Sequence, residues 1–118
     1  MDMIFTVEFY ETEAGACPVR EFMDKLKTSD PDDFAAVVAG LAKLRNRLYH
    51  REPLAKALGG GLFEMRHVGK LNTRILWFFV KGCRIVAVLA IRNKGRAIPG
   101  KDIETARGRM HDWQIRER

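Results

Sequence analysis

Positively charged side chains interrupt a series of apolar, strand-like segments in the second half of the chain. The segments are Gly60–Arg66, Thr73–Phe79 and Arg84–Lys94. Arg66 ends the first segment and Arg74 lies inside the second, although arginine is rarely buried in an apolar strand unless it is paired. Guanidinium groups form directed hydrogen bonds with phosphates and carboxylates. A sheet that carries them on one face is therefore expected to hold an anion, and RNA phosphate fits best.

The charge of the chain is distributed unevenly along its length. The net charge of the 118 residues is +6. Residues 1–44 carry four Lys/Arg against nine Asp/Glu, whereas residues 45–118 carry 17 against six. This asymmetry indicates that the second half faces a polyanion.

The bulk composition predicts a single globular domain spanning residues 1–118. The sequence is 47% hydrophobic and 31% charged, which is ordinary for such a domain. No apolar run approaches the roughly 20 residues that cross a bilayer. Residues 1–10 have no basic segment of the kind that opens a secretory signal. We therefore expect a cytoplasmic protein without a membrane partner.

The cysteines and histidines do not have the spacing of a metal site. Cys17 and Cys83 are too few for a disulfide framework, and His50, His67 and His111 complete no zinc motif. We expect reduced thiols, no metal and no cofactor.

The apolar periodicity predicts an α+β fold. Residues Ile4–Tyr10 alternate as a half-buried strand. An amphipathic helix is expected over Val19–Lys27, and a second helix opens at Asp30, a suitable N-cap before Pro31. The apolar stripe of the second helix is Phe34, Val37, Val38, Leu41, Leu44 and Leu48.

The rest of the chain completes a β-α-α-β-β-β-α order. The residues from His50 to Gly59 are expected to form a loop before a triple-glycine turn. Three strands follow, of which the last two form a hairpin around Lys81-Gly82. A final helix is expected over Lys101–Trp113. The predicted architecture is a small antiparallel sheet with the helix hairpin on one face and the other face partly open.

Three blocks of this sequence resemble the RelE/ParE superfamily of type II toxins, in the HigB-like branch that is also found in phages. The first block is Gly61–Arg66 and the second is Thr73–Phe78. The third is Ala90–Lys94 with the Pro99 and Ile103–Ala106 that follow it. Together with the order of the elements, the likeness covers nearly the whole chain.

The resemblance implies a RelE-like fold and a ribosome-dependent mRNA endonuclease that blocks translation. It also implies neutralisation by an antitoxin, often a helix-turn-helix DNA-binding protein. Cleavage of RNA without metal uses the 2′-hydroxyl as nucleophile. Its proton must be removed, the charge of the phosphorane stabilised and the leaving 5′-oxygen protonated.

The resemblance assigns these tasks to cations of the strands. Arg66 and Arg74 would stabilise the charge of the phosphate and the transition state. Lys94 would be a second charge stabiliser or a general acid. RNA binding would involve Arg92, Arg96, Lys101 and His67, and His67 is also the weaker candidate for a general base.

Each assignment has a structural alternative. Arg66 could pair with Glu64, which lies two residues away on the same strand face. Arg74 could form a buried ion pair, and Arg92 and Lys94 could be solvated loop cations. At the level of function, the alternatives are a gyrase-inhibiting toxin of the same fold and a catalytically inactive module that binds RNA or an antitoxin. Asn93, where the family usually has lysine, and Thr73, where it has an aromatic residue, favour these alternatives.

Overall fold

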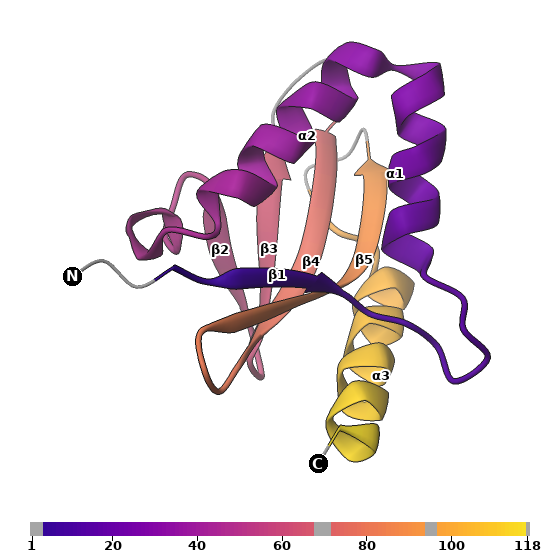
Figure 1. The fold of residues 1–118 in the computed structure, drawn as a ribbon, viewed down its shortest axis with the longest axis vertical. Coiled ribbons are helices and arrows are strands. Elements are labelled where there is room, and N and C mark those ends of the chain that lie inside the picture. The colour runs from indigo at the N-terminus through magenta and orange to yellow at the C-terminus, as the bar shows by residue number, and fades with distance from the viewer. Residues whose placement is uncertain (1–3, 68–71, 94–96, 118) are drawn as a thin grey trace.

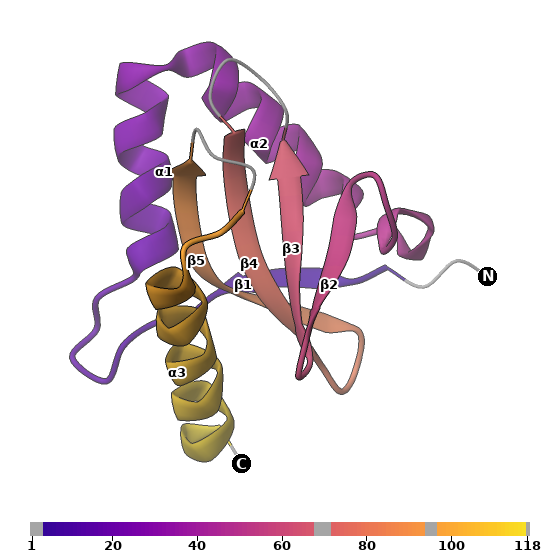
Figure 2. The same cartoon turned by 180° about the vertical axis from the view of Figure 1, so that it is seen from behind.

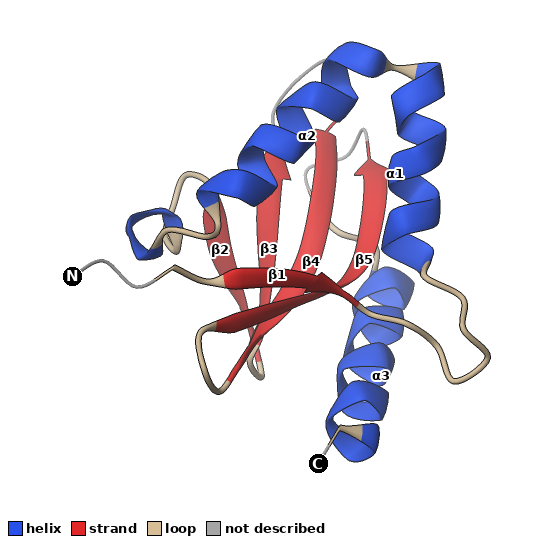
Figure 3. Cartoon of the chain, viewed as in Figure 1, coloured by secondary structure: helices blue, strands red, loops and turns tan. Residues whose placement is uncertain are grey.

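The computed structural model describes residues 4–67, 72–93 and 97–117. In this part of the chain, five strands form one sheet and three α-helices lie against it (Figures 1 and 3). The strands are β1 (Thr6–Phe9), β2 (Ala55–Gly59), β3 (Leu62–His67), β4 (Asn72–Val80) and β5 (Arg84–Asn93). The helices are α1 (Pro18–Ser29), α2 (Pro31–Lys43) and α3 (Gly100–Arg116), with a short 3₁₀ helix η1 at Arg47–Tyr49.

The strands lie in the order β1-β5-β4-β3-β2. The α+β class is confirmed, as is the order of the predicted elements, and two details differ from the prediction. The segment expected to be a loop contains β2, an edge strand that pairs with β3. The sheet is also mixed, because β1 pairs with β5 in parallel while the other pairs are antiparallel. The helix hairpin between β1 and the later strands is long enough to allow this crossover.

The helix hairpin is set by the residues at its corner. The side chain of Asp30 accepts a hydrogen bond from the backbone N–H of Asp33 (3.2 Å), and Pro31 occupies the first turn of α2, as predicted. Two members of the expected stripe do not join the core. Val38 is exposed, and Leu48 lies beyond the end of α2 in η1, where it is exposed as well.

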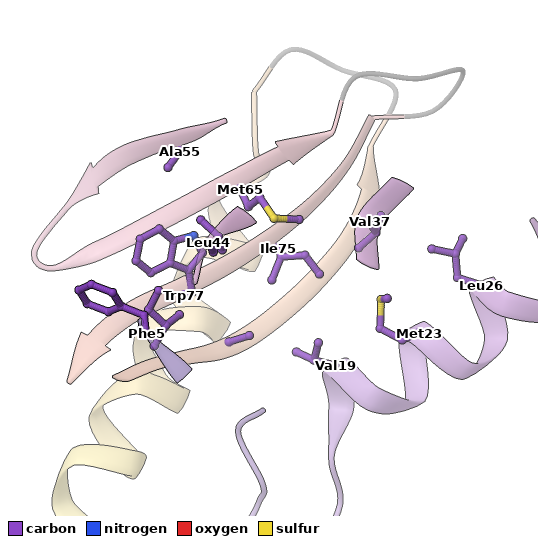
Figure 4. Close-up of a cluster of buried hydrophobic side chains, with 12 residues drawn as sticks. Phe5, Val19, Met23, Leu26, Val37, Leu44, Ala55, Met65, Ile75 and Trp77 are labelled. Carbon is purple, nitrogen blue, oxygen red and sulfur yellow. The ribbon is translucent and has the colours of Figure 1, made fainter. Parts of the chain in front are cut away.

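The main core lies between the helix hairpin and the sheet (Figure 4). Val19, Met23 and Leu26 of α1 face Ile75 of β4 and neighbouring strand residues. A Cβ at Gly40 of α2 would lie 3.0 Å from the sulfur of Met65, so glycine permits the close approach of α2 to β3. The burial of these side chains from water holds the hairpin on this face.

A second core lies on the opposite face, under α3. Ala106 and Met110 of α3 pack on Leu76 and Phe78 of β4, together with Val86 of β5. Figure 2 shows α3 beside β5, with no helix in front of β3 and β2. We call the α3-side surface of β2, β3 and β4 that α3 does not cover the open face. The sequence-predicted Arg66 and Arg74 belong to this face.

The turns between the strands follow the predicted glycines. Gly59, Gly60 and Gly61 all have positive φ angles, of 92°, 63° and 88°, and they join β2 to β3. Gly82 (φ 91°) and Cys83 (φ 57°) close the hairpin of β4 and β5. Such angles strain most side chains but not glycine.

Candidate RNA-binding face

Strand alternation brings Glu64, Arg66 and Arg74 together on the open face. Leu62 of β3 and Leu76 of β4 belong to the core under α3. Side chains two residues apart share a face of a strand, so Glu64 and Arg66 lie on the side of Leu62 and Arg74 on the side of Leu76. The register then places Arg66 directly opposite Arg74.

The carboxylate of Glu64 partly compensates the positive charges of the two facing arginines. Like charges directly opposite each other destabilise a sheet. Nη2 of Arg66 donates a hydrogen bond to Oε1 of Glu64 (3.3 Å), and Nη1 of Arg74 lies 3.7 Å from Oε2 of Glu64. One carboxylate thus faces two guanidinium groups, which leaves this triad with a formal charge of +1. Lys56 of β2, which is exposed and directly opposite Glu64, adds another positive charge.

The two arginines differ in their access to solvent. The side chain of Arg66 is 37% exposed, whereas the side chains of Arg74 and Glu64 are each 2% exposed. Arg66 can therefore contact a phosphate directly in this arrangement. Arg74 is placed to reinforce the positive potential and to hold Glu64. Both pairings that the sequence left open, Arg66 with Glu64 and Arg74 in a buried ion pair, are present.

Arg92 lies on the other face of the sheet, away from the triad. It is paired in register with Thr73, and its Nη2 lies 2.9 Å from Oδ2 of Asp30 and 3.3 Å from Oδ2 of Asp33. Thr73 donates a hydrogen bond from Oγ1 to the same Asp33 oxygen (2.6 Å). These contacts attach β5 and β4 to the corner of the helix hairpin. The sequence did not single out Asp33 as an anchor, because its partners are distant in the chain.

Of the remaining predicted residues, Lys101 and His67 lie within the described part of the chain. Lys101 is exposed in the first turn of α3. His67 is the last residue of β3 and is paired in register with Thr73. Lys94 and Arg96 lie outside the described residues.

Some basic residues of the second half of the chain serve the fold. Arg107 of α3 donates hydrogen bonds to the carbonyl oxygens of Gly59 (3.0 Å) and Leu58 (3.3 Å). Arg109 donates to the carbonyl oxygen of Val88 (2.8 Å). These contacts attach α3 to the turn after β2 and to β5, so the basic composition overstates the charge available to a ligand.

A cavity of about 470 Å³ lies next to Arg66, between the end of α2, η1 and the start of β2. Arg66 is part of its lining, and two further cations, Lys43 and Arg51, line it as well. Sequence reasoning missed this cavity. The signal that could have found it is the cluster of basic residues from Lys43 to Arg51 that surrounds Tyr49.

The described part of the chain contains neither a group of metal ligands nor a membrane-spanning helix. In residues 4–67, 72–93 and 97–117, no three His, Cys, Asp or Glu side chains are grouped so that they could bind a metal ion. None of the helices in these ranges is long and apolar enough to cross a membrane.

The five-stranded mixed sheet with its three helices places the protein in the α+β class, and two facing arginines of neighbouring strands mark its candidate site. Residues 21–111 match the family model described as Phage derived protein Gp49-like (DUF891). The match covers most of the chain, and the protein belongs to this family. The family is toxin-like and related to RelE/HigB, and its members are commonly toxins of toxin–antitoxin systems, which implies an antitoxin partner in general. A comparison with curated proteins found no match.

Proposed function

We propose that this protein is a toxin that cleaves mRNA on the ribosome and thereby blocks translation. The observation that carries the proposal is the triad on the open face. There, an accessible arginine and a buried arginine share one carboxylate. Excess positive charge fixed on a rigid sheet suits the stabilisation of a phosphorane, because preorganised charges need no reorganisation during the reaction.

The proposed reaction is attack of the ribose 2′-oxygen on the adjacent phosphorus. The bond from phosphorus to the 5′-oxygen breaks, which yields a cyclic phosphate and a free 5′-hydroxyl. Arg66 contacts the phosphate and Arg74 supports the charge through the triad. Lys94 would stabilise the leaving oxygen or protonate it, and His67 is the candidate base for the 2′-proton. Arg96 and Lys101 would contribute attraction to RNA rather than chemistry, whereas Arg92, which was predicted with them, is held by Asp30 and Asp33 on the other face.

The proposed partners follow from the reaction. Ribosome-bound mRNA is the substrate, and the antitoxin is proposed to be a helix-turn-helix DNA-binding protein. The protein would act in the cytoplasm, as a single domain without a cofactor.

The test is cleavage of mRNA on programmed ribosomes by the wild type, Arg66→Ala and Arg74→Ala. We expect cuts within the A-site codon and a loss of about 10²–10³-fold in rate for Arg66→Ala, in line with the loss of one charge-stabilising donor. Arg84→Ala is the matched control. Arg84 is also a strand arginine paired with a glutamate. Its partner, however, is Glu8 on β1, which lies at the other edge of the sheet from the triad. That variant should cleave like the wild type.

A supercoiling assay with DNA gyrase, run in parallel, separates the alternatives. Inhibited supercoiling without cleavage would replace the proposal with a gyrase inhibitor. The absence of both effects, with folded protein, would leave a binding module. Equal loss in Arg66→Ala and Arg84→Ala would show that the open face has no special role.

A further inference from the structure

The cavity beside Arg66 combines positive charge with an aromatic ring. Lys43, Arg51 and Arg66 line it against a single acidic residue, Glu52. Tyr49 also lines it, and this large aromatic side chain is 41% exposed, with Nζ of Lys43 5.7 Å from the centroid of its ring. Cations with an accessible aromatic ring are the elements with which proteins bind an unpaired nucleotide.

The remaining wall of the cavity is apolar. Leu48, Pro53 and Leu54 supply it. The volume of about 470 Å³ lies within the range of small-ligand sites. A nucleobase has an apolar face and a polar edge, so it fits between such a wall and the tyrosine ring better than a free phosphate does.

The loop that forms the cavity is held in place by its own hydrogen bonds. The side chain of Asn46 accepts from the backbone N–H of Leu48 (2.9 Å), and the N–H of Tyr49 donates to the carbonyl of Asn46 (3.0 Å). A ring nitrogen of His50 is 2.6 Å from the carbonyl oxygen of Leu44. The Tyr49 ring is thus presented by an ordered loop, which lowers the entropic cost of binding.

The cavity is also joined directly to the triad. The N–H of Ala55 donates to the carbonyl of Arg51 (3.0 Å), and the N–H of Arg66 donates to the carbonyl of Leu54 (3.0 Å). Nε of Arg66 has no hydrogen-bond partner among the described residues, and Glu64 engages its Nη2 at 3.3 Å. Arg66 therefore belongs both to the triad, through its guanidinium, and to the lining of the cavity.

We infer that this cavity binds one unpaired nucleotide of the RNA strand, next to the phosphate held by Arg66. The base stacks on Tyr49 against the apolar wall. Arg51 and Lys43 neutralise the phosphate on its other side. This inference rests on the proposed function, because it assigns a neighbouring nucleotide of the same substrate. It adds a stacking contact that selects single-stranded RNA over a duplex.

The test uses the full chain and a short oligoribonucleotide that contains one 2-aminopurine. Fluorescence anisotropy gives the affinity, and quenching of the 2-aminopurine reports stacking. We expect Tyr49→Ala to weaken binding by roughly 10-fold, within the range for loss of one stacked base, and to abolish quenching. Tyr49→Phe keeps the ring and should bind like the wild type. Ile115→Ala, a truncation of an exposed apolar side chain on α3, is the control and should also be neutral.

Each result decides the inference separately from the proposed function. Loss in Tyr49→Ala with retention in Tyr49→Phe supports it. Unchanged binding in Tyr49→Ala overturns it, and so does equal loss in Tyr49→Phe, equal competition by a duplex RNA, or no binding by the wild type. None of these results depends on cleavage. The ribosome assay judges the proposed function, and a cleaving Tyr49→Ala variant with unchanged RNA affinity would keep that function while removing this site.

Discussion

Glu64 is the residue on which the arrangement of the two arginines depends. Its buried carboxylate contacts both guanidinium groups, and Arg74 is as buried as Glu64. Removal of one partner of a buried ion pair costs about 3–5 kcal/mol, because it leaves the other charge poorly compensated. We expect Glu64→Gln to lower the free energy of unfolding by about 3 kcal/mol, measured by urea denaturation.

The exposed ion pair of Glu8 with Arg84 provides the comparison. These side chains are 36% and 40% exposed. Exposed pairs contribute about 0.2–1 kcal/mol, so Glu8→Gln should change the unfolding free energy by less than about 1 kcal/mol. If the two substitutions cost the same, the buried carboxylate of Glu64 contributes no more to stability than the exposed carboxylate of Glu8.

The contacts of single residues could be predicted from the sequence only where they are local. The pairing of Arg66 with Glu64 follows from strand alternation, and the cap at Asp30 follows from the proline after it. The partners of Arg92 could not be predicted in this way. Asp30 is 62 residues away in the chain, and only the packing of the helix hairpin on the sheet brings it within 2.9 Å of Arg92.

At the scale of elements, the parallel strand β1 is attached to β5 at the edge of the sheet through an ion pair. Nε and Nη2 of Arg84 donate to the two carboxylate oxygens of Glu8 (2.6 and 2.9 Å). These hydrogen bonds hold the pKa of Glu8 below its ordinary value of 4.5. A carboxylate whose pKa is lowered by folding stabilises the folded state above its unfolded pKa. This contribution is lost as pH falls through the folded pKa.

This linkage predicts a pH-dependent difference between the wild type and Glu8→Gln. The wild type should be more stable at pH 7, and the difference should begin to shrink near the ordinary pKa of 4.5 and vanish at lower pH. Urea midpoints measured across this range check it. A difference that is constant with pH would show that the amide disturbs β1 by packing and not by charge.

The elements that could not be predicted are those without a local signature. Strand β2 has the sequence Ala-Lys-Ala-Leu-Gly, which contains no β-branched or aromatic residue. Its extended conformation depends on its pairing with β3. The sequence also contains no periodic pattern that would predict the parallel pairing of β1 with β5. By contrast, the turns at Gly59–Gly61 and Gly82 were predictable, since glycine tolerates positive φ.

At the scale of the whole molecule, the acidic first part of the chain and the basic remainder form different elements of the fold. The acidic first half forms the helix hairpin, which covers one face of the sheet (Figure 1). The triad lies on the open face, and the cavity lies near η1. Figure 1 shows α1 and the connection between α2 and β2 at opposite ends of the molecule. A substitution that changes a charge should therefore affect RNA binding according to its position, even when two such substitutions change the net charge equally.

Two substitutions separate position from net charge. Lys25→Glu on α1 and Arg51→Glu beside the cavity both change exposed residues and both lower the net charge from +6 by two. Each phosphate contact to a single strand contributes about 0.7 to the slope of log K against log salt concentration. We expect Arg51→Glu to reduce this slope by about that amount and to weaken binding, and Lys25→Glu to leave the slope unchanged.

The measurement is RNA affinity by anisotropy over a series of salt concentrations. Equal changes in both variants would mean that RNA responds to the net charge alone and not to a defined face. A larger effect at Lys25 would place the RNA on the helix hairpin. A change confined to Arg51→Glu would place an RNA phosphate beside the cavity, within the surface that also contains the triad.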